Sequence, residues 1–240
     1  MKTFAAIWIT ISLLAAPAVA SDCRDVSFEE TSFTVCEADP ASEDVRLFLN
    51  DASGARLGTF DNVADAVAPK SLAWAMNAGM YHPDRSPVGL YVENGLQTKK
   101  IVTRAGPGNF GLLPNGVLCL GDGKATIVES RAFAKTAPDC RFATQSGPML
   151  VIDGALHPRF LKESDSLNIR NGVGVAPDGR LFAVISNDRV NFHRFARFFR
   201  DVLGTPNALF LDGKVSRLYA PELNRHDLGF PVGPLLGVVK

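Results

Sequence analysis

The sequence predicts a strand-rich α+β fold, in which a single mixed domain contains β-hairpins and one prominent amphipathic helix. Short runs of β-branched and aromatic residues recur along the chain, and Gly, Asn-Gly and Asp-Gly turn signals separate them. One segment near the C-terminus instead repeats its apolar residues at helical spacing. The chain has 240 residues, 46% of them hydrophobic, and no linker divides it, so we expect one domain over residues 21–240.

The first twenty residues have the layout of a secretory signal peptide. Lys2 precedes an apolar stretch from Phe4 to Leu14, and Ala18-Val19-Ala20 forms an A-x-A cleavage site. That stretch is too short to span a bilayer, and no later segment approaches the roughly 20 apolar residues that a spanning helix needs. We therefore expect cleavage after Ala20 and a periplasmic or secreted protein without a membrane span.

The cysteines are even in number, which in an exported protein favours disulfides. Four cysteines allow three pairings. We favour the sequential one, Cys23 with Cys36 and Cys119 with Cys140, because each pair flanks a short strand-rich segment that can fold back on itself. A zinc site is the alternative, but no C-x-x-C spacing or nearby His pair supports it.

Charge and motifs exclude several classes of protein. Lys plus Arg equals Asp plus Glu at 25 each, so the net field attracts neither nucleic acid nor anionic membranes. A P-loop and a dinucleotide fingerprint are absent, and Thr144-Gln145-Ser146-Gly147 does not supply the G-x-S-x-G of a nucleophile elbow. We expect no cofactor and no metal. Calcium stays an alternative, because Asp84, Asp153 and Asp212 are suitable ligands at an undiagnostic spacing.

The turn signals delimit a series of short predicted strands. We expect Asn115-Gly116 to join Phe110–Leu113 and Val117–Leu120 into a hairpin. The other predicted strands are 33–36, 45–49, 72–76, 89–92, 125–128, 149–152, 172–175, 181–185, 208–211 and 235–239. Strands therefore dominate the prediction.

One helix stands out. Asn191 is a suitable N-cap and Gly204 a suitable end, and the apolar side between them consists of Phe192, Phe195, Ala196, Phe199, Val202 and Leu203. The other side carries His193, Arg194, Arg197 and Arg200, which we interpret as a solvated face in preference to a ligand patch. Shorter helices are expected at residues 63–68 and 130–137.

Four segments place polar residues or glycines at the end of a strongly apolar strand. Strand ends can hold polar groups at fixed spacing, and glycine lets a ligand approach the backbone. The segments are Asn77–His82, Gln145–Pro148, Arg170–Gly172 and Asp212–Gly213. Each alone is ordinary turn chemistry.

Together these segments resemble the phosphodiester glycosidase family, over roughly residues 72–239. Asn77–Tyr81 looks like the family's Asn-Gly-Gly-Phe-Phe segment, and Ser146–Leu150 matches its Ser-Gly-Pro-x-Leu segment. Arg170 before Val173-Gly174 resembles its Arg before a Val-Gly strand, and Asn207–Gly213 matches its Asn-Ala-Leu-x-Leu-Asp-Gly segment.

The chain also departs from the family pattern. Where the family continues Asp-Gly-Gly-Gly-Ser-Ser, this chain has Lys214 and Val215 in place of two glycines, and Arg217 ends the segment. Ala78 and Met80 replace the commoner Gly and Phe. These changes bear on the substrate more than on the fold.

The resemblance implies hydrolysis of a sugar-1-phosphodiester or a related glycosidic bond. Such a reaction needs a carboxylate, a cationic partner for the departing phosphate and hydrogen bonds to the sugar. We expect Asp212 as the carboxylate and Arg170 as the phosphate clamp, with Asn77 beside them. Expected substrate-binding residues are Gln145, Ser146, Gly147, His82, Asn187 and Ser216.

Alternative interpretations of these residues stay open. Asp212 in an Asp-Gly turn can simply cap its own backbone, and Arg170 can form a structural salt bridge to Asp153 or Asp165. His82 before a proline also reads as a plain loop residue. For the whole protein, the alternative is a non-catalytic periplasmic protein that binds an envelope glycan or glycopolymer. In either case the expected partner is a carbohydrate or glycosyl phosphate.

Overall fold

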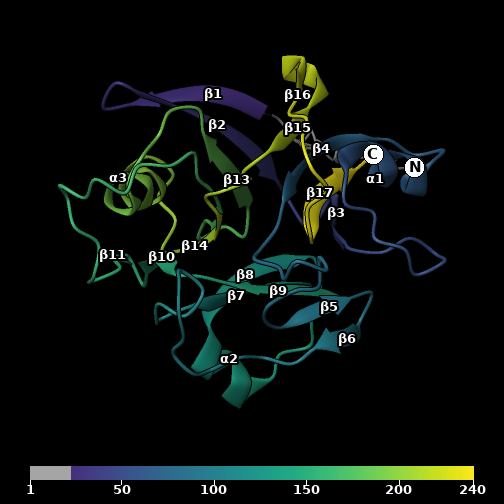
Figure 1. Ribbon diagram of the computed structural model, residues 1–240, viewed down its shortest axis with the longest axis horizontal. Helices are drawn as coiled ribbons and strands as arrows, with labels where there is room; N and C mark the ends of the chain where they lie inside the picture. Colours follow the sequence, from purple (N-terminus) through teal and green to yellow (C-terminus); the bar gives the residue numbers. More distant parts are fainter. Residues whose placement is uncertain (1–22) are drawn as a thin grey trace, which may run out of the picture.

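The computed structural model describes residues 23–240, so the predicted signal peptide, residues 1–20, lies outside the described residues. Within this range the chain forms three antiparallel sheets and three α-helices. Figure 1 shows the sheets arranged around a common centre, with α3, α1 and α2 each on the outer side of one sheet. The predicted strand-rich α+β character is confirmed.

The first sheet has seven strands in the order β1-β2-β13-β12-β14-β10-β11. Its strands are β1 (Cys23–Phe28), β2 (Thr31–Ala38), β10 (Met149–Ile152), β11 (Ala155–Leu156), β12 (Asn171–Val175), β13 (Leu181–Ser186) and β14 (Asn207–Asp212). Two of the Asp-Gly turn signals, Asp153-Gly154 and Asp178-Gly179, join β10 to β11 and β12 to β13.

The other two sheets have five strands each. The second runs β16-β15-β4-β17-β3 and contains β3 (Asp44–Phe48), β4 (Leu72–Asn77), β15 (Leu218–Ala220), β16 (Arg225–His226) and β17 (Leu235–Val239). The third runs β6-β5-β9-β7-β8 and contains β5 (Tyr91–Glu93), β6 (Leu96–Lys99), β7 (Gly116–Gly121), β8 (Lys124–Glu129) and β9 (Phe142–Ser146).

The largest hydrophobic cluster lies where the three sheets face one another. It combines Val173 of the first sheet, Trp74 of the second and Phe142 of the third, all essentially buried. Separate clusters lie beneath the helices α1 (Phe60–Val67), α2 (Ser130–Thr136) and α3 (Phe192–Arg197). Because both faces of most strands are covered, the strand ends and their loops are what remains to form a site.

The prominent helix begins as predicted but does not keep its predicted register. Asn191 caps α3 by accepting a hydrogen bond from the Arg194 amide. The helix continues over Phe198–Val202 with the wider turns of a π-helix. Because these turns hold an extra residue, Phe198 is buried and Val202 is 41% exposed, whereas the predicted apolar side included Val202 and omitted Phe198.

The predicted hairpin at Asn115-Gly116 is wrong. Phe110–Leu113 forms no strand, and β7 instead pairs with β8 across Asp122-Gly123. The Phe110 carbonyl accepts a hydrogen bond from the Asn115 side chain at 2.9 Å. Gly111 lies so close to Gly106 that an added Cβ would come within 2.1 Å of its backbone. These local contacts close the segment into a loop, which takes the place of the predicted strand.

The disulfide pairing is the sequential one, as predicted. Cys23 and Cys36 face each other across the β1–β2 ladder, and Cys119 of β7 joins Cys140 just before β9. No cysteine of residues 23–240 is free, so the alternative of a cysteine zinc site is wrong.

Candidate functional site

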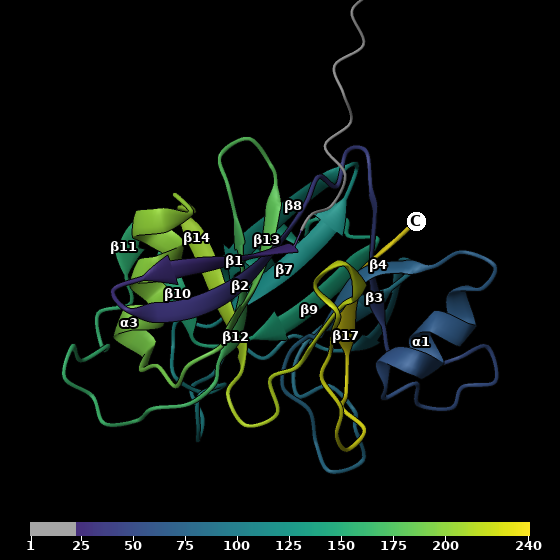
Figure 2. The same cartoon turned by 90° about the horizontal axis from the view of Figure 1, so that it is seen from above.

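The strand pairing of the first sheet brings two of the predicted residues together. β12 begins at Asn171, and β14 ends at Asp212, directly opposite it in the antiparallel register. Arg170 precedes β12 by one residue, so its side chain starts beside the end of β14. Figure 2 shows the turn after β14 and the loop after β4 projecting from the same end of the molecule.

A cavity of about 600 Å³ opens at this end. Four loop regions form its wall: one follows β4, one precedes β7, one precedes β12 and one follows β14. Its lining residues are Met80, Tyr81, Val88, Gly108, Asn109, Ser166, Asn168, Arg170, Asp212, Gly213, Lys214 and Val215. Two of the expected catalytic residues, Arg170 and Asp212, therefore share one cavity.

The guanidinium of Arg170 is buried, with 1% of the residue exposed. Its Nε donates to the Val190 carbonyl at 2.9 Å, and its Nη2 donates to the Ser166 carbonyl at 2.8 Å. The Phe192 ring lies against the guanidinium, with 3.8 Å between Cζ and the ring centroid. These contacts hold the orientation of the guanidinium.

Arg170 carries its charge without a carboxylate partner. Among residues 23–240 no carboxylate oxygen lies within 4.0 Å, so the alternative salt bridge to Asp153 or Asp165 is not formed. Burial lowers the pKa of Arg170 from its ordinary value to about 10, which leaves it charged at neutral pH. Nη1 has no hydrogen bond to the described chain and lies near the position that a Cβ on Gly213 would occupy, 3.3 Å away. A buried cation with a free N–H edge suits an anionic ligand.

The two oxygens of Asp212 have different environments. Oδ1 accepts hydrogen bonds from the amides of Gly213 at 2.5 Å and Lys214 at 2.7 Å, with a longer one from Val215 at 3.4 Å. This is the backbone-capping turn considered as the alternative. Oδ2 has no hydrogen-bond partner within residues 23–240. One oxygen therefore fixes the turn, and the other remains available to a ligand.

Asn77 lies beneath the cavity and does not line it. It is fully buried, and its Oδ1 accepts from the Asn171 side chain at 3.0 Å and from the Arg217 amide at 2.8 Å. Its Nδ2 has no partner in the described part of the chain. Ser216, close by, donates to the Asp212 carbonyl at 2.9 Å. Asn77 thus links β4 to β12 next to the strand ends that carry Arg170 and Asp212.

The Gln145 side chain is committed to hydrogen bonds with residues that flank the strands of the third sheet. Its Oε1 accepts from the amides of Leu90 and Val102, and its Nε2 donates to the Val102 carbonyl and the Ser130 hydroxyl. The side chain is buried and lies outside the cavity. This arrangement leaves no free hydrogen-bonding capacity for a substrate.

Ser146 and Gly147 are also internal. Ser146 donates to the Leu211 carbonyl at 3.2 Å, which ties the end of β9 to the strand that carries Asp212. Gly147 packs on Asn115, because an added Cβ would lie 2.5 Å from the Asn115 Cβ. Both residues lie outside the cavity lining, and their contacts support the strand ends around it.

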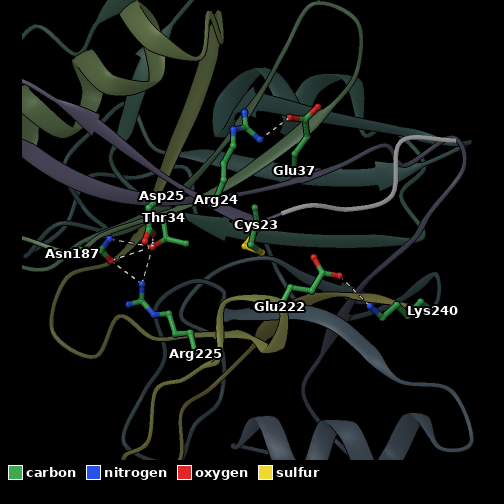
Figure 3. Close-up of a disulfide and its surroundings, with 10 residues drawn as sticks. Cys23, Arg24, Asp25, Thr34, Glu37, Asn187, Glu222, Arg225 and Lys240 are labelled. Carbon is green, nitrogen blue, oxygen red and sulfur yellow. Dashed lines mark hydrogen bonds and ion pairs between the residues drawn. A yellow bond between two sulfur atoms is a disulfide. The ribbon is translucent and has the colours of Figure 1, made fainter. Parts of the chain in front are cut away.

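The structure separates Asn187 and His82 from this group. Figure 3 shows Asn187 next to Thr34 and Arg225, and its side chain forms hydrogen bonds with both. His82 is exposed in the loop after β4, and its amide donates to the Ser86 carbonyl, as the loop interpretation predicted. Neither residue lines the cavity.

Several lining residues were not singled out from the sequence. Tyr81 ends the segment that begins at Asn77, and its pKa is raised first by burial and then by the negative charge of Asp212. Lys214 was noted only as a departure from the family pattern. Phe192 lies outside the lining but contacts Arg170; it was assigned to a helix face, and no local signal indicates that contact. Asn109 and Asn168 come from loops with no motif.

Neither a metal-ligand cluster nor a membrane-spanning helix is found in the described part of the chain. Within residues 23–240, no group of three or more His, Cys, Asp or Glu side chains is arranged to hold a metal ion. Over the same range, no helix combines the length and the apolar character needed to cross a bilayer.

Comparison with known proteins gives a family match and a shared fold. Residues 70–239 match the model of a family described as phosphodiester glycosidase. The chain is 36% identical over 216 residues to uncharacterized protein YigE of Escherichia coli (strain K12), covering 89% of this chain and 84% of that protein.

Two solved structures share the fold at low identity. The first is the catalytic domain of zebrafish N-acetylglucosamine-1-phosphodiester alpha-N-acetylglucosaminidase, auto-inhibited by its pro-peptide, with a TM-score of 0.65 and 13% identity over 90% of this chain and 81% of that one. The second is a hypothetical protein from Synechocystis, with a TM-score of 0.59 and 15% identity over 90% of this chain and 61% of that one.

Proposed function

Because the chain belongs to the phosphodiester glycosidase family, we propose that it is an exported hydrolase that cleaves a sugar-1-phosphodiester in the cavity lined by Arg170 and Asp212. The name of the zebrafish relative specifies such a bond for that enzyme. One observation carries the proposal for this chain: a buried arginine without a carboxylate partner and a carboxylate with a free oxygen line the same cavity.

The charge distribution suits a phosphodiester better than a neutral glycoside. Arg170 and Asp212 do not pair with each other, since no ion pair within 4.0 Å joins them. A diester monoanion between them satisfies the free Nη1 of Arg170 and leaves Asp212 facing the sugar. A neutral sugar would leave the buried guanidinium without a counter-charge, which is unfavourable at low dielectric.

In this mechanism the bond between the anomeric carbon and the phosphate oxygen breaks, and the oxygen keeps the bonding electron pair. Arg170 stabilises the negative charge that develops on the departing phosphate. Asp212 stabilises the positive charge that develops on the anomeric carbon, as nucleophile or as base for the attacking water. Water finally supplies the hydroxyl of the sugar product, and its second proton is released or taken up by the phosphomonoester.

The surroundings of the pair fit these roles. The hydrogen bonds from Gly213 and Lys214 to Oδ1 fix the carboxylate, so that Oδ2 presents a single direction to the ligand. Tyr81 provides an aromatic ring in the wall, and its raised pKa keeps its hydroxyl protonated as a donor. Asn77 and Ser216 support the strand ends from behind, through their hydrogen bonds to Asn171 and to the Asp212 carbonyl.

The disulfides agree with an exported protein, since such bonds persist in oxidising compartments. We therefore keep the periplasm or the cell exterior as the proposed location, with cleavage of residues 1–20. N-terminal sequencing of the protein recovered from the periplasm tests this step directly. Recovery of the uncleaved chain in the cytoplasm would contradict it.

The test of function is turnover by purified protein of a panel of methyl glycosyl-1-phosphodiesters, with the matching neutral methyl glycosides beside them. We expect release of free sugar from at least one diester and from none of the neutral glycosides. Asp212→Asn should lower kcat by at least about 100-fold, because it removes the carboxylate charge while preserving the shape of the turn. Asn187→Ala is the matched control, since Asn187 lies outside the cavity.

The non-catalytic alternative predicts a different result. Two results together would favour a non-catalytic binding protein. The wild-type protein would hydrolyse no diester of the panel, and it would bind envelope glycans with an affinity that Asp212→Asn does not change.

A further inference from the structure

Arg170 is unusual in how its charge is accommodated. A buried arginine is normally paired with a carboxylate, which occupies a guanidinium edge and neutralises the charge. Here Nε and Nη2 donate to the main-chain carbonyls of Val190 and Ser166, and these carbonyls supply no full negative charge. The Phe192 ring lies against the flat face of the guanidinium, 3.8 Å from Cζ, and the Phe210 ring lies farther away, at 5.5 Å.

Phe192 is itself held rigidly. Phe160 stacks on the same ring, with centroids 4.9 Å apart and planes 8° apart, and Phe210 meets its edge at 4.7 Å. Phe192 is the first residue of α3, immediately after the N-cap Asn191. The Asn191 side chain also donates to the Lys162 carbonyl at 2.9 Å, which ties the helix start to the loop before β12.

The two ways of accommodating a buried cation have different consequences for a ligand. A carboxylate would take a pair of N–H donors and cancel the charge, so an incoming phosphate would have to displace it. An aromatic face attracts the cation through its quadrupole and uses no N–H donor. Nη1 consequently stays free, and it lies near Gly213, where any side chain would crowd it.

We propose that Phe192 is a positioning residue, which stabilises the Arg170 guanidinium through its ring face and so keeps the charge and the Nη1 edge of Arg170 available to a phosphate group in the cavity. The inference rests on the proposed function only in taking the ligand as a phosphate ester. It assigns to the start of α3 a role in binding in addition to its role in the core.

The test measures the affinity for inorganic phosphate, which requires no turnover. Phe192→Leu should raise the Kd for phosphate about tenfold, the size of effect expected for a desolvated cation–π contact, whereas Phe192→Tyr should stay within about twofold of wild type. Phe28→Leu is the matched control, because the Phe28 ring contacts the Arg197 guanidinium at 5.2 Å on a different part of α3. It should leave the Kd unchanged.

A double-mutant cycle separates positioning from general loosening of the fold. In an Arg170→Met background, Phe192→Leu should produce no further change in the phosphate Kd, because Phe192 acts through Arg170. Equal effects of Phe192→Leu with and without Arg170 would overturn the inference, as would an unchanged Kd in Phe192→Leu. Phe192-dependent phosphate binding in a protein that hydrolyses no diester would instead refute the proposed function and leave this inference standing.

Discussion

Replacing Arg170 with methionine separates its role in function from its role in stability. Burial lowers the pKa of Arg170 from its ordinary value to about 10, which corresponds to roughly 3 kcal/mol of unfavourable free energy for holding the charge inside the protein. This cost is present in full at neutral pH, because both the folded and the unfolded chain carry the charge there. It diminishes only as the pH rises through about 10, where the folded protein loses the proton first.

Methionine removes that cost together with favourable contacts. The hydrogen bonds to Val190 and Ser166 each contribute about 1 kcal/mol, and the Phe192 contact contributes about as much. The gain and the losses nearly cancel, so Arg170→Met should change the free energy of unfolding by no more than about 1 kcal/mol. Removing one partner of a buried ion pair would instead cost about 3–5 kcal/mol.

Phosphate binding is measured by the increase in thermal stability that it causes. At ten times its Kd, a ligand that binds only the folded state stabilises it by about 1.4 kcal/mol. For a protein of this size that raises Tm by about 3–6 °C. At this phosphate concentration, ten times the wild-type Kd, wild type should show the full shift, and Arg170→Met, whose Kd is higher, should show little of it. Arg225→Met is the control, because Arg225 pairs with Asp227 away from the cavity, and it should keep the shift. A loss of several kcal/mol in Arg170→Met, with the phosphate shift retained, would refute the reasoning.

Two further predictions concern stability. Burial lowers the pKa of His157 below 6.5, so the unfolded chain binds more protons at this residue, and the free energy of unfolding should fall as the pH falls through 6.5. His157→Phe should make the free energy of unfolding less dependent on pH, as measured by urea titrations at pH 7.5 and pH 5. The same pH dependence in both proteins would contradict this prediction. The Cys119–Cys140 disulfide, with a sequence separation of 21, should contribute about 3 kcal/mol to the free energy of unfolding. The double alanine variant should therefore unfold at a lower Tm, and an unchanged Tm would contradict this.

The sequence was informative about which polar strand ends come together. Arg170 and Asp212 were predicted from short motifs, because each motif combines an apolar strand with a polar terminus and the antiparallel pairing of β12 and β14 brings those termini together. The disulfide pairing followed from similar local reasoning. Asn77 and Ser146 also converge on this region, although their buried hydrogen bonds make them supports for it.

The sequence was uninformative where a contact joins distant segments. The Phe192–Arg170 contact depends on how α3 packs against the first sheet, and the register of that helix changes at its π-helical turns. The loop at Phe110–Leu113 closes through the Asn115 side chain, which competes with the turn chemistry that the Asn-Gly pair suggested. Gln145 was expected to bind a ligand because it is a polar residue at a strand end. The sequence does not reveal which backbone groups such a side chain will bind.

The most direct test of the central claim is to identify which bond is broken. A glycosyl-1-phosphodiester that the protein hydrolyses is incubated with it in water enriched in oxygen-18. Mass spectrometry of both products then shows which of them has taken up the solvent oxygen. If Asp212 and Arg170 act on the anomeric carbon and the departing phosphate, the label enters the sugar hydroxyl and the phosphomonoester stays unlabelled. Label in the phosphate would mean attack at phosphorus and would contradict the mechanism.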